Sequence, residues 1–538
     1  MDAQHPDAQA ALVATAPDGA AVAAAIPRRY NFAADVLARN LAAGRGGKAA
    51  YIDPRGTWTY ADLAERVARF GKVLRALGIA REQRILICLT DTIDWPTAFL
   101  GAVQAGVVAV PVNTLMSEAD YRFMLEDSRA RLLVVSEELY PRFASLIAAC
   151  PDLAHVIVSG ADAHGHALFE EVLQAAAGPD LIAPTHRDDI CFWLYTSGST
   201  GRPKGAVHVQ AALRLTDDLY GAPVLGLTEN DIVYSVAKLF FAYGLGNAMT
   251  FPLSAGATTV LMPGRPTPDG VAALLRQHGV SVFFAVPTFY AAFLAADPIE
   301  GAALRLRSCV SAGEALPVDV GRRWSERYGV DILDGLGSTE MLHIFLSNRI
   351  GEVRYGTTGK PIPGYDLRIV DDAGKPVARG EMGELQVRGP TSAIMYWNSR
   401  DQSRATFLGE WTRSGDKYIE DEDGYYLYCG RRDDMLKVGG IYVAPFEVEG
   451  ALLSHHDVLE AAVVAWPDDD RLIKPKAFVV LKPSCPATEE TAQALREHCR
   501  QKLAAYKYPR WIEFRKELPK TATGKIQRFR LRDEAPQG

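Results

Sequence analysis

A loop rich in glycine and hydroxyl groups, residues 196–205, has a composition suited to binding phosphate. It reads Thr196-Ser-Gly-Ser-Thr-Gly-Arg-Pro-Lys204-Gly and directly follows the apolar run 191–195, which predicts a buried strand. Because glycine has no Cβ, backbone N–H groups in such a loop can approach an anion closely. The hydroxyls add further donors, and Lys204 adds a positive charge. We therefore predict that this loop cradles a polyphosphate group.

The spacing of the loop differs from that of a Walker A motif. Counted from Gly198, that motif requires glycine at position 203 and serine or threonine at 205, whereas this chain has Pro203 and Gly205. Composition alone is also compatible with a flexible surface loop. The strand before the loop and the lysine within it favour phosphate binding instead.

The elements that must position this loop alternate between helices and strands. Short apolar runs bounded by polar residues predict buried strands, and apolar residues at helical spacing predict the helices between them. Such alternation is typical of a parallel sheet in an α/β fold. The expected elements are helices at 61–77 and 95–105 and strands at 84–90, 107–112, 132–136 and 191–195.

The pattern of apolar and turn-forming residues changes near residue 350. Short strand-like pieces with frequent turn signals predict a small β unit over 350–430. We place a domain boundary at Arg432/Asp433, after which residues 433–538 form a separate unit. Its expected elements are strands at 458–466 and 476–482 and a helix at 489–504.

Overall composition excludes several classes of protein. The 538 residues carry a net charge of −7, which argues against a nucleic-acid-binding protein. The seven cysteines are scattered and form no C-x-x-C pair, so a disulfide framework and a zinc site of that kind are not expected. No apolar run has the length of a membrane span. Residues 1–26 contain no lysine or arginine, so we interpret them as a disordered tail of a cytoplasmic protein.

A local basic stretch departs from this acidic average. Between Arg500 and Arg532 there are eleven lysines and arginines, opposed only by Glu513 and Glu517. Such a stretch can be an ordinary solvated face. It can also be a surface that contacts a polyphosphate ligand.

Six motifs occur in an order that resembles the adenylate-forming superfamily of acyl-CoA synthetases, adenylation domains and luciferase. The first is the phosphate loop. The others are Ser311-Ala-Gly-Glu-Ala-Leu-Pro317, Gly335-Leu-Gly-Ser-Thr-Glu340, Ser414-Gly-Asp416, Gly430-Arg-Arg-Asp-Asp-Met-Leu-Lys437 and Pro519-Lys-Thr-Ala-Thr-Gly-Lys525. Together they cover the chain from about residue 30 to 532.

The resemblance implies a fold and a reaction. The fold is α/β, with a large N-terminal AMP-binding domain (27–432) that holds two α/β subdomains and the small β unit. A small mobile α+β C-terminal domain (433–538) follows. In the reaction, an acid attacks the α-phosphorus of ATP to give an acyl-adenylate and pyrophosphate, and a thiol then displaces AMP. ATP, Mg²⁺ and the co-substrate coenzyme A are the implied cofactors.

The resemblance also implies roles for individual residues. Thr339 would donate to the α-phosphate, Glu340 would hold Mg²⁺, and Lys525 would bridge the acid and the α-phosphate, where charge develops. One departure from the family is Leu336, where an aromatic residue is common. The implied ATP- and AMP-binding residues are Thr196, Ser197, Gly198, Ser199, Thr200, Gly201, Lys204, Gly313, Glu314, Asp334, Gly335, Asp416 and Arg431.

The C-terminal domain of the family rotates between the two half-reactions. Asp433 matches the hinge of that rotation, which would remove Lys525 from the site. The segment with Lys437 would enter instead, and Gly439 and Gly440 would leave room for the pantetheine arm of coenzyme A. Without the family context, the two glycines are compatible with a plain turn.

Two segments, 238–247 and 340–345, face the acid pocket in the family. Tyrosine and isoleucine beside small residues suit a flat ring, and His343 could donate to a carboxylate. Both segments resemble those of benzoate–CoA ligases, so we predict benzoate as the acid. The residues expected to line the pocket are Ala242, Tyr243, Gly337, His343 and Ile344.

Other functions remain compatible with the sequence. Within the enzyme class they are a 4-hydroxybenzoate or aminobenzoate CoA ligase, and an adenylation enzyme that loads a carrier protein. Outside it they are a nucleotide-binding module without transfer chemistry and a phosphate-cleaving NTPase. The expected partners are small molecules, with no nucleic acid and no membrane, and the expected state is a monomer or homodimer.

Overall fold

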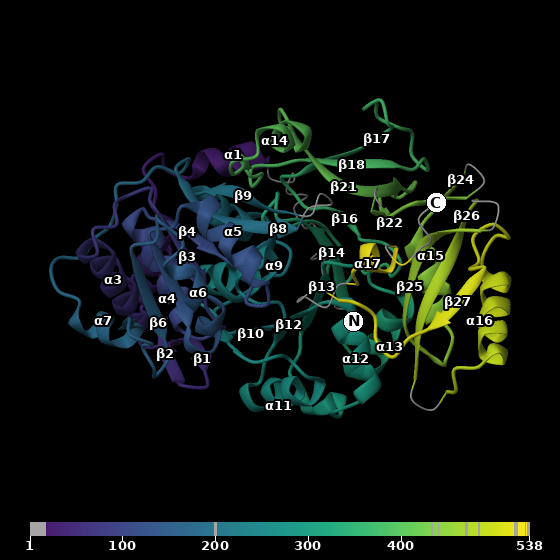
Figure 1. Cartoon of the computed structure of the whole chain (residues 1–538), viewed down its shortest axis with the longest axis horizontal. Coiled ribbons are helices and arrows are strands. Elements are labelled where there is room, and N and C mark those ends of the chain that lie inside the picture. Colours follow the sequence, from purple (N-terminus) through teal and green to yellow (C-terminus); the bar gives the residue numbers. More distant parts are fainter. Residues whose placement is uncertain are drawn as a thin grey trace, which may run out of the picture.

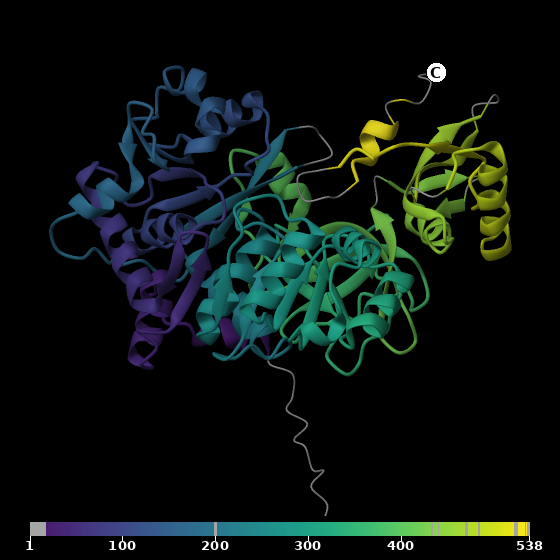
Figure 2. The same cartoon turned by 90° about the horizontal axis from the view of Figure 1, so that it is seen from below.

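A computed structural model shows a large N-terminal part and a smaller C-terminal part (Figure 1). It describes residues 18–197, 202–431, 434–438, 441–468, 472–482, 485–520, 526–532 and 534. Figure 2 shows the C-terminal part to one side of the N-terminal part, with the last helix reaching back between them.

The first large sheet has eight strands in the order β19-β9-β8-β4-β3-β5-β6-β7. Pairing is parallel from β8 to β7, whereas β9 and β19 add an antiparallel edge. The strands are β3 (Arg84–Cys88), β4 (Val108–Pro111), β5 (Leu132–Ser136), β6 (His155–Ser159), β7 (Ala167–Leu168), β8 (Ile190–Ser197), β9 (Pro203–Val209) and β19 (Met395–Tyr396). The helices of this region are α2 (Phe32–Ala42), α3 (Tyr60–Ala76), α4 (Asp94–Ala105), α5 (Glu118–Ser128), α6 (Ala144–Ile147), α7 (Phe169–Ala175) and the short 3₁₀ turn η1 (Glu137–Arg142).

The second large sheet has nine strands in the order β16-β15-β14-β13-β12-β10-β11-β1-β2. Its centre is parallel, and both of its ends are antiparallel. The strands are β1 (Ala49–Asp53), β2 (Gly56–Thr59), β10 (Ile232–Ser235), β11 (Thr258–Val260), β12 (Val282–Ala285), β13 (Ser308–Ala312), β14 (Ile332–Gly337), β15 (Ile344–Ser347) and β16 (Lys360–Pro361). The helices are α8 (Gln210–Thr216), α9 (Ala242–Leu245), α10 (Phe251–Ala255), α11 (Pro268–His278), α12 (Pro287–Ala296) and α13 (Val318–Tyr328), with π-helical η2 (Asp217–Gly221) and η3 (Gly246–Thr250) and 3₁₀ η4 (Gly301–Ala303).

A five-stranded antiparallel sheet lies within the range predicted to be a small β unit. The prediction of a β unit over 350–430 describes its core, but two strands from the same range join other sheets. β16 extends the nine-stranded sheet and β19 extends the eight-stranded sheet. The five-stranded sheet consists of β17 (Asp366–Val370), β18 (Gly383–Arg388), β20 (Phe407–Leu408), β21 (Trp411–Glu420) and β22 (Tyr426–Arg431), with helix α14 (Arg400–Thr406) beside it.

The C-terminal part combines a hairpin with a three-stranded sheet. The long strands β25 and β26 pair antiparallel, and β27 adds to β26 in parallel. The elements are β23 (Leu436–Val438), β24 (Ile441–Val443), α15 (Pro445–Leu453), β25 (Val458–Pro467), β26 (Ile473–Leu481), α16 (Glu489–Lys502), β27 (Trp511–Phe514) and α17 (Arg528–Arg532).

The helices and strands expected from the sequence are present with small differences at their ends. Helix α3 starts one residue before the expected position 61, because Thr59 is the N-cap residue of a capping box. The Thr59 hydroxyl accepts from the backbone N–H of Asp62, and the Asp62 carboxylate accepts from that of Thr59, so two exposed N–H groups at the helix start are satisfied. None of the helices in the described ranges has the length and apolar character needed to cross a bilayer.

The expectation of a disordered tail over residues 1–26 is wrong for its last part. Residues 19–25 form helix α1 (Gly19–Ala25), whose N-cap is the Asp18 side chain. Ile26 is buried, and the Arg187 guanidinium donates to the carbonyls of Ala23 and Ile26. This tertiary contact with a distant arginine leaves no signal in the alanine-rich sequence itself. Residues 1–17 lie outside the described residues.

A buried ion cluster joins the start of the chain to the first large sheet. Asp94, at the start of α4, is 1% exposed and accepts from Arg66 at 2.6 Å and from Ser159 at 2.7 Å. Arg55 donates to the same carboxylate at 3.0 Å. Because charges in the interior need partners, this cluster fixes how α3 and α4 pack.

The substitution Asp94→Ala is predicted to lower the free energy of unfolding by about 3 kcal/mol, because it removes the buried partner of Arg66 and leaves that charge only the more exposed Glu170 carboxylate. The measurement is urea unfolding followed by tryptophan fluorescence. The matched control is Arg69→Ala, which removes the surface pair with Glu65 on the same helix and is expected to cost less than about 0.5 kcal/mol. Equal effects of the two substitutions would contradict the assignment.

Candidate active site

The phosphate loop connects two antiparallel strands of the first sheet. Thr196 in β8 is paired with Lys204 in β9, so the loop leaves and re-enters the sheet at one point. Residues Gly198, Ser199, Thr200 and Gly201 lie outside the described residues, as does the Ser197 side chain. Gly205 has no room for a side chain, because an added Cβ would lie 2.8 Å from Cδ1 of the buried Trp193. The strands therefore hold both ends of the loop rigidly.

Four of the residues predicted to bind ATP or AMP lie where two parallel strands end together, and we call this place the nucleotide edge. β13 and β14 pair so that Ser311 lies opposite Asp334 and Ala312 opposite Gly335. The turn after β13 contains Gly313 at φ 97°, a conformation that favours glycine, followed by Glu314. The structure thus brings together Gly313, Glu314, Asp334 and Gly335, as the sequence predicted.

Buried polar atoms at this edge are suited to a bound ligand. Asp334 Oδ1 and Ser311 Oγ are both buried, and apart from their interaction with each other neither atom has a hydrogen-bond partner among the described residues. Burial raises the pKa of Asp334 well above its usual range. Because unpaired buried polar groups are costly, these atoms are appropriate partners for the amino and ring nitrogens of a nucleotide base.

Thr339 and Glu340 follow β14 and are held by residues distant in the sequence. The backbone carbonyl of Thr339 lies 2.7 Å from Nε2 of the buried His208. The Glu340 carboxylate accepts from the Tyr396 hydroxyl at 2.6 Å. Burial and the negative charge of Glu340 raise the pKa of Tyr396 well above its usual range, so the phenol keeps its proton and donates.

Tyr396 also connects Glu340 to the phosphate loop. The Lys204 ammonium lies 5.4 Å from the centroid of the Tyr396 ring, within the range of a cation–π contact. Tyr396 therefore contacts both groups: Lys204, which can bind phosphate oxygen, lies by its ring, and the Glu340 carboxylate, which can bind a hard cation, lies at its hydroxyl. This arrangement suits a magnesium–polyphosphate ligand.

Asp416 and Arg431, two further residues predicted to bind ATP or AMP, lie next to each other. They are register partners on β21 and β22, and their side chains approach to 3.5 Å. Asp416 is buried, whereas the Arg431 side chain is 57% exposed. The negative charge of Asp416 raises the pKa of Arg431, and this effect outweighs the lowering caused by burial of the guanidinium. Arg431 is therefore positive at any physiological pH. The buried carboxylate can accept from hydroxyls while the exposed guanidinium reaches outward.

The C-terminal part contacts the nucleotide edge directly. The backbone N–H of Ile526 donates to the Glu314 carboxylate at 3.3 Å. Lys525, the residue before it, lies outside the described residues, as do Asp433, Gly439 and Gly440 and the side chain of Lys437. The backbone of Lys437 pairs with Tyr442 in the hairpin of β23 and β24, and Val438 pairs with Ile441.

The predicted acid pocket lies between helix α9 and the ends of β14 and β15. The Tyr243 side chain reaches from α9 to strand β13, where its hydroxyl donates to the carbonyl of Val310 at 3.1 Å. Its ring centroid lies 5.7 Å from that of His343. Ala242 precedes Tyr243 on α9, and Ile344 follows His343 at the start of β15. Four of the predicted pocket residues are thus close together.

Gly337, the fifth predicted pocket residue, is required by close backbone approach. A Cβ added there would lie 2.6 Å from the carbonyl oxygen of His343. A Cβ added at Gly335 would lie 3.1 Å from the Ile344 side chain. Glycine at both positions lets β14 and β15 bring the nucleotide edge and the acid pocket together.

The protonation of His343 follows from its contacts. Its Nε2 lies 3.1 Å from Asn247 Oδ1 and 3.3 Å from the Tyr243 carbonyl. With acceptors at this nitrogen, the proton of a neutral ring resides on Nε2. Burial lowers the pKa of His343 to about 3, so the ring is neutral at physiological pH.

The other nitrogen of His343, Nδ1, is consequently an acceptor. It is buried without a hydrogen-bond partner among the described residues. The sequence suggested that His343 could donate to the carboxylate of the acid. In this tautomer Nδ1 instead favours a ligand group that donates a hydrogen bond.

Three residues of the site were missed by sequence reasoning. Tyr396, His208 and Asn247 contact Glu340, Thr339 and His343 across separations of 56, 131 and 96 residues. Asn247 lies within a segment singled out for the pocket, but no local pattern distinguishes it from its neighbours. Contacts at such separations are set by the tertiary fold.

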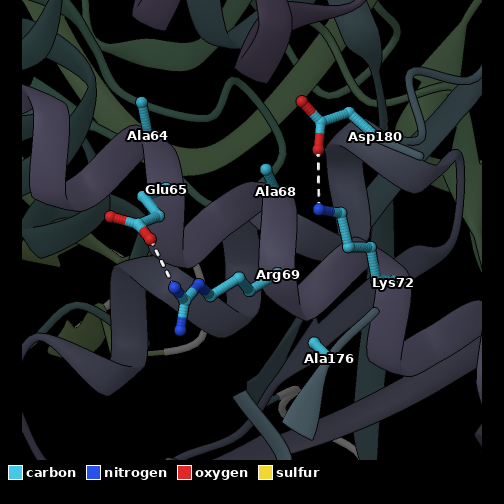
Figure 3. A pocket seen from close by; sticks show the side chains of 7 residues that line it. All are labelled: Ala64, Glu65, Ala68, Arg69, Lys72, Ala176 and Asp180. Atoms are coloured by element: carbon cyan, nitrogen blue, oxygen red, sulfur yellow. Dashed lines mark hydrogen bonds and ion pairs between the residues drawn. The ribbon is translucent and has the colours of Figure 1, made fainter. Parts of the chain in front are cut away.

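A surface hollow of about 440 Å³ lies elsewhere, between α3 and the region of α7 (Figure 3). Two ion pairs, Glu65–Arg69 and Lys72–Asp180, cross its surface. Its lining residues are Ala64, Glu65, Ala68, Arg69, Lys72, Ala176 and Asp180. None of them belongs to the predicted site, and the paired charges leave no group there with evident chemistry.

Comparison with known families gives two matches. A family described as AMP-binding enzyme matches residues 38–397, and one described as AMP-binding enzyme C-terminal domain matches residues 447–525. The two matches lie on either side of the predicted boundary at residues 432 and 433.

Comparison with individual proteins gives relatives of nearly full length. The chain is 58% identical over 511 residues to a benzoate–CoA ligase of Thauera aromatica, covering 94% of this chain and 96% of the relative. It is 51% identical to a crystallised benzoate CoA ligase of Burkholderia xenovorans, with a TM-score of 0.88 and coverage of 94% and 100%. An anthranilate CoA ligase in complex with anthranoyl-AMP is 44% identical, with a TM-score of 0.91 and coverage of 95% and 98%.

Tyr396→Phe is predicted to weaken binding of magnesium–ATP about tenfold, because a carboxylate without its orienting hydroxyl holds a cation less well. Isothermal titration with magnesium–ATP measures the change. The matched control is Tyr425→Phe, which alters a tyrosine whose ring contacts Arg354 and Lys360 away from the site. An unchanged affinity in Tyr396→Phe would exclude the hydroxyl from the cation site.

Proposed function

Because the chain belongs to the AMP-binding enzyme family, we propose that it is an AMP-forming acid–thiol ligase that joins benzoate to coenzyme A. The products are benzoyl-CoA, AMP and pyrophosphate. The observation that carries the choice of acid is the neutral, aromatic acid pocket around Tyr243 and His343. It is supported by high identity to relatives named as benzoate–CoA ligases.

The pocket suits an uncharged flat ring. Its aromatic walls are Tyr243 and His343, and burial keeps the imidazole neutral. Ala242 leaves space that a larger side chain would fill, whereas Gly337 lets the backbones of β14 and β15 approach closely. An aliphatic chain of comparable length would lose the favourable packing against two rings. The carboxylate of benzoate would then point toward the charged nucleotide edge.

The first half-reaction joins benzoate to AMP. A carboxylate oxygen of benzoate attacks the α-phosphorus of ATP, and the bond to the β-phosphate oxygen breaks, so pyrophosphate leaves. Lys204 and the phosphate loop would hold the β- and γ-phosphates, and Asp416 would accept from the ribose hydroxyls. A Mg²⁺ ion held by Glu340 would neutralise charge on the phosphates.

Thr339 and Lys525 would complete the catalytic group. Thr339 would donate to the α-phosphate. Lys525 would bridge the acid oxygen and the α-phosphate, where negative charge builds up in the transition state. The contact between Ile526 and Glu314 supports this role, because it brings the segment next to Lys525 to the nucleotide edge.

The second half-reaction transfers the benzoyl group to sulfur. The thiolate of coenzyme A attacks the acyl carbon, and the bond to the phosphate oxygen breaks, so AMP leaves. In our proposal the C-terminal domain rotates about Asp433 between the two steps. The segment from Lys437 to Gly440 would then replace Lys525, and its glycines would admit the pantetheine arm.

An amino- or hydroxybenzoate is the second candidate acid. The unpartnered acceptor Nδ1 of His343 favours a ring with a hydrogen-bond donor. The similar anthranilate CoA ligase acts on an aminobenzoate according to its name. We propose the cytosol as the compartment and a monomer or homodimer as the state, with small molecules as the only partners.

The test of this function is exchange of labelled pyrophosphate into ATP with each of a panel of benzoates. Exchange that depends on benzoate, followed by coenzyme A-dependent AMP release, is the expected result. Absence of exchange with every aryl acid would overturn the proposal. Exchange without AMP release to coenzyme A would instead indicate a carrier-protein acceptor.

The variant Lys525→Ala separates the two half-reactions. It is expected to lose at least about a hundredfold in adenylation, because a charge that stabilises the transition state is removed. It should retain most thioester formation from supplied benzoyl-adenylate. Equal loss in both assays would contradict the rotation scheme.

Gly246→Ala is predicted to raise KM for benzoate about tenfold, since overpacking here would displace the His343 ring. The added Cβ would lie 2.3 Å from Cδ2 and 2.6 Å from Nε2 of His343. KM for ATP should stay unchanged. Gly264→Ala is the control, because nothing lies within 4 Å of its added Cβ. Unchanged benzoate kinetics in Gly246→Ala would remove His343 from the pocket.

A further inference from the structure

Three consecutive residues of the C-terminal part, His455, His456 and Asp457, bring two imidazoles and a carboxylate together. They lie between the end of α15 and the start of β25, and we call them the histidine patch. One ligand atom from each residue lies within 4.8 Å of the others, and among the described residues this is the single group of three that does so. The patch belongs to none of the groups used in the proposed reaction.

The distances within the histidine patch suit a small tetrahedral ion. His456 Nε2 lies 3.2 Å and His455 Nδ1 lies 3.8 Å from Asp457 Oδ2. Zinc bonded to nitrogen or oxygen at about 2.0–2.1 Å requires ligand atoms about 3.4 Å apart at the edges of its tetrahedron. Small side-chain rotations would therefore place the three atoms around one ion.

Two further donors adjoin the patch. The backbone N–H of Lys482 donates to the Asp457 carbonyl at 2.8 Å, and that of Cys485 donates to the Lys482 carbonyl at 3.0 Å, so Cys485 lies in a turn next to Asp457. The His498 ring lies edge-on to His455 with centroids 5.1 Å apart, and its Nε2 contacts the Ser454 hydroxyl at 2.9 Å. Lys502, which donates to Ser454 at 2.8 Å, is the nearby cation.

An ion at the patch would replace a contact that one imidazole makes. His455 Nδ1 accepts from the backbone N–H of Asp457 at 3.3 Å. A ligating histidine must be neutral, because only the neutral ring offers a lone pair to the ion.

We propose that the histidine patch is a binding site for a zinc-class divalent transition-metal ion, ligated by His455, His456 and Asp457. Nitrogen donors distinguish it from the oxygen site of Glu340, because imidazole suits zinc, copper and nickel, whereas magnesium prefers oxygen ligands. Water or the Cys485 thiolate completes the coordination.

Binding at the patch stabilises the C-terminal domain. The ligands join the end of α15 to the start of β25, and Cys485 belongs to the loop before α16. An ion bound by the folded chain and not by the unfolded chain shifts the folding equilibrium toward the folded state. Within the described part of the chain, no contact of the patch reaches a residue of the predicted site, so we expect the ligase reaction not to require the ion.

The experiment uses the full chain freed of metal and titrated with Co²⁺ in the absence of ATP. A tetrahedral site gives visible d–d absorption at one ion per chain, and Zn²⁺ displaces the signal. A sulfur-to-cobalt charge-transfer band appears if Cys485 is a ligand. Zn²⁺ is expected to raise the midpoint of thermal unfolding.

Two variants decide whether the patch binds the ion. His456→Ala removes a ligand whose side chain is 81% exposed, so the fold is preserved, and the Zn²⁺ affinity is expected to fall at least about tenfold. The matched control is His164→Ala, which breaks a histidine–aspartate pair of 3.5 Å with Asp162 outside any such group of three. The control should keep full affinity.

Two results would overturn the proposal. One is equal affinity in the unaltered chain and in His456→Ala. The other is binding weaker than about 1 mM, the mark of an adventitious ion only. Pyrophosphate exchange in the same samples is a separate readout of the proposed function, so failure of either inference is recognised independently.

Discussion

The parallel pairing of β13 with β14 is the constraint on which the site depends. Parallel strands end at the same edge of a sheet, so the segments after them meet although they are distant in the sequence. This pairing places Ser311 opposite Asp334 and brings the turn at Gly313 beside Gly335. The strand that follows, β15, returns antiparallel and carries His343 and Ile344 to the same edge. The residues predicted to bind the nucleotide and those predicted to line the acid pocket thus lie close together, where β13 and β14 end and β15 begins.

Charge is divided sharply between these two sides. Lys204, Glu340 and Arg431 provide charged groups on one side, with the buried Asp416 carboxylate next to Arg431. The acid pocket contains a neutral imidazole because burial makes its charged form too costly. In the proposed function, this division would orient an aromatic acid with its ring inward and its carboxylate toward the phosphates. Tyr396 is at the polar side, where it donates to Glu340 and lies beside Lys204.

The C-terminal part has an apolar core of its own. Among the described residues, Ile526 donates to Glu314 and the Phe446 ring of α15 packs against Tyr428 of β22, whereas the apolar core consists of residues of the C-terminal part. Arg528, for example, forms a bidentate pair with the buried Glu449 of its own domain. A domain with its own core and a small interface can change position without unfolding. The histidine patch lies in the turn between α15 and β25 of this domain, so an ion there would act on the stability of the domain and not on the chemistry.

Local sequence determined the elements of this protein, and tertiary structure decided how they combine. Capping residues and apolar spacing are local, so α3, β3, α4 and β5 were predicted closely from residues 60–136. The phosphate loop, Glu340 and Asp416 were recognised from short motifs. Pairing of β1 with β11, the diversion of β16 and β19 into other sheets, and the anchoring of α1 by Arg187 depend on distant partners. The same holds for Tyr396 and Asn247, because a hydrogen bond across 56 or 96 residues is specified only by the packed fold.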